Sequence, residues 1–123
     1  MDLLRKELLI PEAKAVAIAG SNGMGKTTLA MMFGHLNRDF FSAGVYHVHA
    51  TSVESLVRTV DAHVSNPYGP YLLILDEIDR RPAYEMRFEI EELRRARPSA
   101  RLICITTQQF LAMPVDLSLQ LRG

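Results

Sequence analysis

The feature that most constrains the fold is a glycine-rich segment between an apolar run and a helical pattern. The apolar run Ala15–Ala19 predicts a buried strand, and residues 26–37 predict a helix. The intervening segment fits the pattern G-x-x-x-x-G-K-[ST] at Gly20, Gly25, Lys26 and Thr27. This order implies a strand that leads through a tight glycine loop directly into a helix.

A loop of this kind suits phosphate binding, because backbone N–H groups converge where the helix dipole adds partial positive charge. Glycines let the backbone approach a phosphate without a Cβ in the way. The pattern therefore predicts nucleotide binding, with Lys26 reaching the β- and γ-phosphates and the Thr27 hydroxyl coordinating Mg²⁺. The alternative is a glycine-rich turn with a chance lysine. The predicted nucleotide contacts in this segment are Gly20, Ser21, Asn22, Gly23, Met24, Gly25, Lys26, Thr27 and Thr28.

Bulk properties limit the classes of protein to consider. The chain has 123 residues, which suits a single domain over residues 1–123, and its formal net charge is zero. Zero net charge disfavours nucleic acid and anionic membranes as partners. The single cysteine, Cys104, lies in an apolar run and is expected to be buried. Without a signal-peptide pattern or a membrane-spanning run, we expect a cytoplasmic protein.

The rest of the chain alternates apolar runs with helical patterns. Strands are expected over residues 45–50, 71–75, 102–106 and 115–121, and helices over 3–9, 53–64, 83–96 and 108–112. Thr51 or Ser52 is the expected cap of the helix over 53–64. In helix 83–96 we expect Phe88, Ile90 and Leu93 to face inward, and Met31 and Met32 are expected to fill the core. The pattern predicts an α/β three-layer sandwich, with a parallel sheet covered by helices on both faces.

A second group of polar residues follows the apolar run over residues 71–75. Asp76 could hold Mg²⁺ through the water shell of the ion, and Glu77 could orient or deprotonate an attacking water. The alternative is an ordinary polar turn after a buried strand. Arg80 and Arg81 follow, and we favour a solvated turn for them over a role as arginine fingers acting on another subunit. His47 and His49 share one face of a strand, but two histidines without a third ligand make a weak metal site.

Together these segments resemble the STAND class of P-loop NTPases, close to NB-ARC-type nucleotide-binding domains. The resemblance implies a five-stranded parallel sheet of order 5-1-4-3-2. It assigns Gly20–Thr27 to the Walker A motif, Asp76 and Glu77 to Walker B, and Thr106 or Thr107 to a sensor contact with the γ-phosphate. The alternative for these threonines is that a β-branched residue simply suits the end of a strand. It further implies ATP or ADP with Mg²⁺ as cofactors, and assembly with a second copy or with partner domains.

The resemblance favours a hydrolase that serves as a nucleotide-controlled signalling switch, or a fragment of one. Family members often carry arginine where this chain has Gln108, and the chain ends near the last core strand, before the lid domains of the family. Slow hydrolysis is therefore expected. Two alternatives stay open: a non-catalytic nucleotide-binding or interaction module that acts through a partner chain, and an AAA+ or DNA-associated ATPase, suggested by Asp-Glu-Ile-Asp at residues 76–79. The absence of a guanine-recognition signature favours ATP.

Overall fold

The computed structural model describes residues 2–9, 14–21, 25–50, 55–66, 68–107 and 114–121. The predicted helix over 108–112 and the predicted cap residues Thr51 and Ser52 lie outside these residues. In chain order the elements are α1 (Asp2–Leu8), β1 (Ala15–Ala19), α2 (Lys26–Leu36), β2 (Val45–His49), α3 (Leu56–His63), β3 (Tyr71–Asp76), the short 3₁₀ helix η1 (Ile78–Arg80), α4 (Ala83–Ala96), β4 (Ala100–Thr106) and β5 (Leu117–Gln120).

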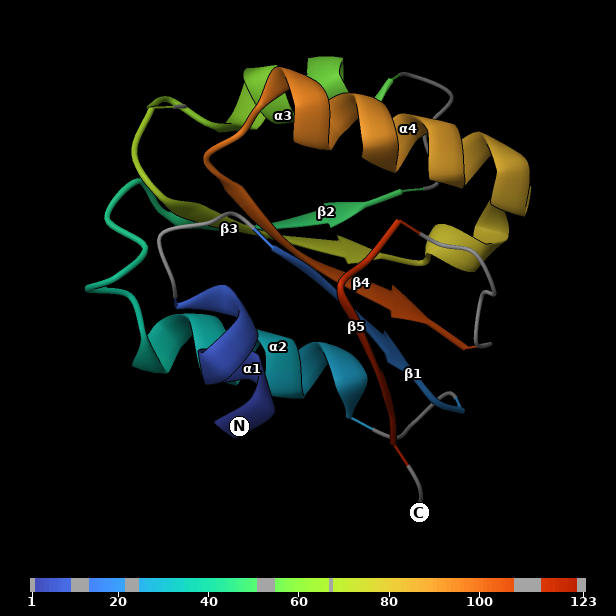
Figure 1. The fold of residues 1–123 in the computed structure, drawn as a ribbon, viewed down its shortest axis with the longest axis horizontal. Helices are drawn as coiled ribbons and strands as arrows, with labels where there is room; N and C mark the ends of the chain where they lie inside the picture. Colours follow the sequence, from blue (N-terminus) through green and yellow to red (C-terminus); the bar gives the residue numbers. More distant parts are fainter. Residues whose placement is uncertain are drawn as a thin grey trace.

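The five strands form one parallel sheet in the order β2-β3-β4-β1-β5 (Figure 1). This is the predicted order read from the other edge, so the predicted fold class is confirmed. Between β1 and β2, between β2 and β3, and between β3 and β4, a helix carries the chain back across the sheet, so that these strands run in the same direction. The carboxyl ends of β1, β3 and β4 therefore lie along one edge, where the glycine loop also begins.

Helices cover both faces of the sheet, and successive strand residues point to opposite faces. One core lies between the sheet and α3 with α4, and it includes Val60, Ile90 and Leu73. The other lies between the sheet and α1 with α2, and it includes Leu4, Phe33 and Ile74. Figure 1 shows the two helix pairs on opposite sides of the sheet. Burial on both faces explains why the central strands read as continuous apolar runs rather than as alternating patterns.

Several local predictions are wrong in detail. Helix α3 begins at Leu56, later than expected, and Ser55 caps it by accepting a hydrogen bond from the Arg58 backbone N–H. In α4, Phe88 is 60% exposed. Met86 is buried there instead, because it and Ile90 lie one helical turn apart on the face toward the sheet.

The burial of Met31 and Met32 differs from the prediction, whereas the burial of Cys104 agrees with it. Met31 and Met32 are exposed on the outer face of α2, where the predicted core filling does not occur. Cys104 is fully buried in the centre of β4, as predicted, and burial raises the pKa of its thiol to about 12. Within the described residues, no helix has the length and apolar character needed to cross a membrane.

Candidate functional site

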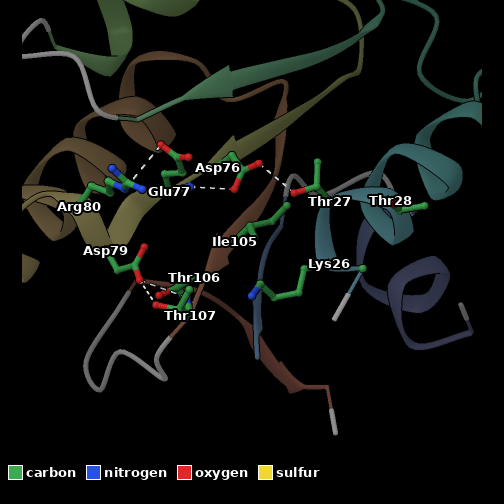
Figure 2. Close-up of a pocket in the computed structure, with 11 residues that line it drawn as sticks. Lys26, Thr27, Thr28, Asp76, Glu77, Asp79, Arg80, Ile105, Thr106 and Thr107 are labelled. Carbon is green, nitrogen blue, oxygen red and sulfur yellow. Dashed lines mark hydrogen bonds and ion pairs between the residues drawn. The ribbon is translucent and has the colours of Figure 1, made fainter. Parts of the chain in front are cut away.

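A pocket of about 650 Å³ opens at the carboxyl ends of β3 and β4, beside the start of α2 (Figure 2). This is the edge at which open α/β sheets bind their ligands. The volume falls within the range of about 300–1,000 Å³ that is usual for small-molecule sites. The lining residues are Gly25, Lys26, Thr27, Thr28, Asp76, Glu77, Asp79, Arg80, Ile105, Thr106 and Thr107.

The described part of the glycine loop enters α2 through Gly25, whose φ of 76° lies in the left-handed region that glycine adopts without strain. Gly25, the N-cap residue of α2, has no side chain with which to cap the helix. At the other end of the loop, the Gly20 backbone N–H donates to the Thr106 carbonyl at 3.2 Å, which joins the loop to β4. The predicted contacts Asn22, Gly23 and Met24 lie outside the described residues.

Lys26 is the first residue of α2, and its side chain folds back along the loop. It is 7% exposed, and its ammonium group donates to the carbonyl oxygen of Gly20 and, at 3.0 Å, to that of Ser21. Both acceptors are neutral carbonyl oxygens, and within the described part of the chain no carboxylate forms an ion pair with Lys26. A phosphate oxygen could replace one of these carbonyls and would make a stronger, charge-assisted hydrogen bond.

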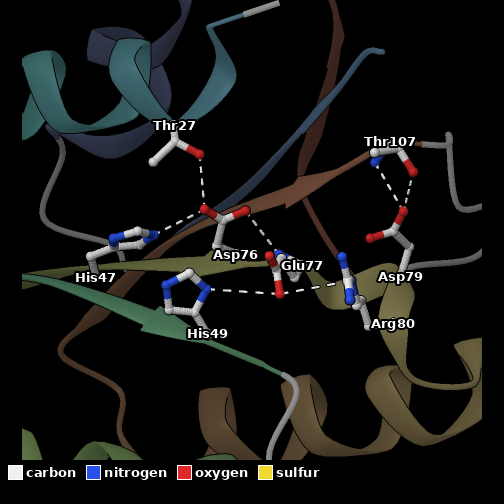
Figure 3. A network of polar contacts seen from close by, with 8 residues as sticks. All are labelled: Thr27, His47, His49, Asp76, Glu77, Asp79, Arg80 and Thr107. Atoms are coloured by element: carbon white, nitrogen blue, oxygen red, sulfur yellow. Dashed lines mark hydrogen bonds and ion pairs between the residues drawn. The ribbon is translucent and has the colours of Figure 1, made fainter. Parts of the chain in front are cut away.

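Asp76 connects three elements at the floor of the pocket. Its Oδ2 accepts from the Thr27 hydroxyl at 2.8 Å and lies 3.0 Å from His47 Nε2, while its Oδ1 accepts from the Glu77 backbone N–H at 2.9 Å (Figure 3). Burial alone would raise the pKa of Asp76. The hydrogen bonds from His47, Thr27 and Glu77 outweigh that effect, so the pKa of Asp76 lies below its ordinary value. Asp76 is therefore an anion at neutral pH.

Glu77 adopts an unusual backbone conformation. Its φ of 58° and ψ of 36° are left-handed, and among the described residues it is the one non-glycine residue with positive φ. Left-handed backbone costs a residue with a Cβ about 1–2 kcal/mol, and such strain is concentrated at functional sites. The side chain is 38% exposed, and its Oε2 lies 3.8 Å from Arg80 Nε and 3.9 Å from His49 Nδ1. Glu77 lines the pocket, and its carboxylate lies between Arg80 and His49 (Figure 3).

The end of β4 carries Thr106 and Thr107, the residues predicted to contact the γ-phosphate. Thr106 is only 2% exposed, whereas Thr107 is exposed and its hydroxyl and backbone N–H both donate to Asp79 Oδ2, the N–H at 3.2 Å (Figure 3). Asp79 was not among the predicted site residues. The signal was present in the run Asp-Glu-Ile-Asp, but the pairing with Thr107 depends on η1 lying beside the end of β4.

Of the two arginines after β3, Arg80 lines the pocket and its side chain is 68% exposed. Arg81 points away from solvent: its side chain is 8% exposed, and it forms ion pairs with Glu85 and, at 3.9 Å, with Glu89. The prediction of a solvated turn is therefore wrong for Arg81, which holds η1 against α4. A buried, paired guanidinium also cannot act on another subunit.

The donor set fits a magnesium nucleotide. The Thr27 hydroxyl and the Asp76 carboxylate, 2.8 Å apart, are oxygen groups of the kind that Mg²⁺ prefers. The lining side chains include three carboxylates, Asp76, Glu77 and Asp79, and two cations, Lys26 and Arg80. The three carboxylates disfavour a polyphosphate at this place, and a divalent cation would offset that repulsion. The arrangement therefore fits a nucleotide that carries a divalent cation.

No protein-family model matches this chain, and no curated protein matches its sequence. Two solved structures are similar. C. elegans PCH-2 superposes with a TM-score of 0.66 and 17% identity over 99% of this chain. A variant of Thermotoga maritima RuvB superposes with a TM-score of 0.62 and 22% identity over 88% of this chain. The matches span 40% and 37% of the lengths of those two proteins.

Both similar structures are AAA+ P-loop ATPases. At identities below one quarter, the likeness concerns the fold. The chain therefore has the α/β fold of P-loop NTPases, with a five-stranded parallel sheet between two helical layers.

Proposed function

We propose that this chain is the nucleotide-binding core of a Mg²⁺-dependent ATPase. The observation that carries the proposal is the hydrogen bond of 2.8 Å between Thr27 and Asp76, which lie 49 positions apart in the sequence. The two residues come from the glycine loop and from the end of β3, and they meet at the floor of the pocket (Figure 2). A hydroxyl and an anionic carboxylate at this place, beside a helix N-terminus, make a suitable support for a metal-bound phosphate.

In this proposal each residue at the loop has a separate task. The backbone of Gly20 to Thr28 surrounds the phosphates, and Lys26 exchanges a carbonyl acceptor for a phosphate oxygen. Thr27 and Asp76 would hold the metal ion, because a hydroxyl and a carboxylate are oxygen ligands of the kind that Mg²⁺ prefers. Bound Mg²⁺ would supply charge neutralisation between the phosphate oxygens and the carboxylates of the pocket.

Glu77 is the proposed catalytic base. Its left-handed backbone and partial exposure leave the carboxylate in the pocket, beside the metal-holding Asp76. It would orient a water molecule and accept its proton as the water attacks the γ-phosphate. Thr106 and Thr107 are proposed to sense the γ-phosphate, and Thr107 would then exchange its bond to Asp79 for a bond to phosphate. Such an exchange gives the loop after β4 two arrangements, one for each nucleotide state.

The class of ATPase is a finer question. The sequence resembles STAND signalling switches, whereas PCH-2 and RuvB are AAA+ ATPases. The similar structures support the AAA+ alternative at least as well as the STAND interpretation. Both classes combine ATP binding with assembly of several copies or domains. We therefore propose a nucleotide-controlled core that works within a larger assembly, and a non-catalytic interaction module is the competing function.

Nucleotide binding is tested by titration calorimetry with ATP and ADP, with and without Mg²⁺. We expect Mg²⁺-dependent binding that Lys26→Ala weakens about 10-fold or more, because a hydrogen bond to a charged group contributes about 1.5–3 kcal/mol. Lys6→Ala is the matched control, since Lys6 is exposed on α1 and far from the loop in the sequence. Equal affinities of Lys26→Ala and the wild type would refute the proposed site.

Hydrolysis is tested with Glu77→Gln, which keeps the size of the side chain and removes its basicity. Turnover should fall about 100-fold or more while Mg²⁺–ATP affinity changes little, because a general base contributes about 10²–10⁴ in rate. Glu91→Gln, at an exposed position of α4, is the control. If the wild type binds ATP but Glu77→Gln hydrolyses it equally fast, Glu77 is not the base. If the wild type binds without any turnover, the interaction module is the better description.

A further inference from the structure

Two histidines on the edge strand β2 lie next to the proposed magnesium site and are not among its proposed metal-holding residues. His47 and His49 are two residues apart, so their side chains project from the same face of the strand. Their ring centroids are 4.8 Å apart. Figure 3 shows both rings directed toward the end of β3. The sequence analysis judged this pair a weak metal site because a third ligand was missing.

The sheet register supplies the third ligand. β2 and β3 run parallel with His49 paired to Asp76, which brings the Asp76 carboxylate beside both imidazoles. One potential ligand atom from each of the three residues lies within 4.8 Å of the others, and His47 Nε2 is already 3.0 Å from Asp76 Oδ2. In a tetrahedral zinc site with bonds of about 2.0–2.1 Å, neighbouring ligand atoms are about 3.3 Å apart. His47 and Asp76 already have about this spacing, so the remaining adjustment is a movement of the His49 ring toward them.

His49 has the freedom to make that movement. Its side chain is 56% exposed, and its Nδ1 lies 3.9 Å from Glu77 Oε2. A rotation about its side-chain bonds would bring a ring nitrogen toward Asp76 without displacing core residues. Glu77 or a water molecule could then complete a four-coordinate shell. The hydrogen bond between His47 and Asp76 explains why one imidazole lies at this carboxylate. It does not explain why the imidazole of His49 lies there as well.

The ligand types determine which metal this cluster selects. Imidazole nitrogens favour zinc and its transition-metal neighbours, whereas Mg²⁺ prefers oxygen ligands and retains several waters. We propose that His47, His49 and Asp76 bind a transition-metal ion of the zinc type. The metal bonds to Asp76 Oδ2, the oxygen that also accepts the hydrogen bond from Thr27, so it takes this carboxylate away from the glycine loop. Zinc is then an inhibitor of Mg²⁺–ATP binding, a consequence that rests on the proposed function.

The metal site itself is tested without nucleotide, by titrating the chain with zinc chloride and with cobalt chloride. We expect one bound ion per chain and a cobalt spectrum typical of nitrogen ligation. Zinc should still bind in the presence of about 5 mM Mg²⁺. His49→Gln should weaken zinc binding about 10-fold or more, and so should His47→Gln. The matched control is His63→Gln, because His63 is exposed on α3 and its Nδ1 lies 2.8 Å from the Thr59 carbonyl oxygen of its own helix. Unchanged zinc affinity in both site variants would overturn the proposal.

Inhibition is tested separately, by measuring ATP affinity in Mg²⁺ with and without one equivalent of zinc. Zinc also binds free ATP in solution, so the zinc-induced change is compared between the wild type and His49→Gln. We expect zinc to weaken ATP binding several-fold more in the wild type. An equal change in both proteins would overturn the inhibitory role. If no variant binds ATP, the proposed ATPase function fails, whereas the direct zinc titration still decides the metal site.

Discussion

The left-handed backbone of Glu77 leads to a prediction about stability that is independent of any nucleotide. A side chain with a Cβ at φ 58° pays a steric cost of about 1–2 kcal/mol, whereas glycine does not. Part of that gain is lost because glycine has more conformational freedom in the unfolded chain. We therefore expect Glu77→Gly to be about 1 kcal/mol more stable than Glu77→Ala.

The comparison with alanine isolates the backbone. Both substitutions remove the contacts of the Glu77 carboxylate with Arg80 and His49, which are 3.8 and 3.9 Å long. Contacts between partly exposed groups at such distances contribute about 0–1 kcal/mol, and this loss is common to both variants. The difference between alanine and glycine therefore reports the strain at this residue and not the ion pairs.

The assay is urea unfolding followed by circular dichroism, with thermal unfolding as a second measure. A difference of about 1 kcal/mol corresponds to about 3–6 °C in Tm for a chain of this size. The matched control is the same pair of substitutions at Glu91, which is exposed in the middle of α4. In a right-handed helix, glycine should be about 1 kcal/mol less stable than alanine, so the sign reverses between the two sites. If glycine is no better than alanine at residue 77, the strain argument is wrong.

Three further predictions concern packing, the buried thiol and a surface ion pair. In Gly34→Ala the added Cβ would lie 2.7 Å from Val45 Cγ1, so α2 must shift away from β2. Urea unfolding should therefore show a loss of about 1–3 kcal/mol in the free energy of unfolding. The double variant with Val45→Ala should recover part of this loss, because it removes the atom that the new Cβ meets. Cys104 has a pKa raised to about 12 by burial, so a thiol reagent at neutral pH should label it only at the rate of unfolding; rapid labelling of the folded protein would contradict this. A hydrogen bond from Arg97 holds the pKa of Asp61 below its ordinary value, so the pair stabilises the fold above about pH 4 and this contribution disappears as the pH falls further. Asp61→Asn should therefore cost less than about 1 kcal/mol at neutral pH, and its unfolding free energy should converge with that of the wild type in acid.

Much of the fold could be predicted because the strong local signals agree with the tertiary structure. Strand β1 and helix α4 have the predicted bounds, Ala15–Ala19 and Ala83–Ala96. Glycine, proline and long apolar runs act on their own neighbourhood, so their effect is visible in a linear sequence. The sheet order came from the family resemblance, since local patterns do not specify which strands are neighbours.

Side-chain placement was harder to predict, and the errors share one cause. On the surface of α4, Arg95 pairs with Glu92, three residues before it, although Glu91 lies four residues before it on the same helix. Both partners are within reach on a helix surface, and exposed ion pairs differ too little in energy for the spacing alone to decide. The buried Arg81 likewise depends on Glu85 and Glu89 of α4, which lie against η1 only in the folded protein.

The sequence by itself determined that a strand, a glycine loop and a helix follow one another, and that a second strand ends in Asp76 and Glu77. These are properties of short, contiguous segments. Only the tertiary structure brought His47 to Asp76 and Asp79 to Thr107, 29 and 28 residues apart. Those contacts follow from the register of β2 against β3 and from the packing of η1 at the end of β4. Register depends on which side chains bury each face of the whole sheet, and that is a property of the assembled core.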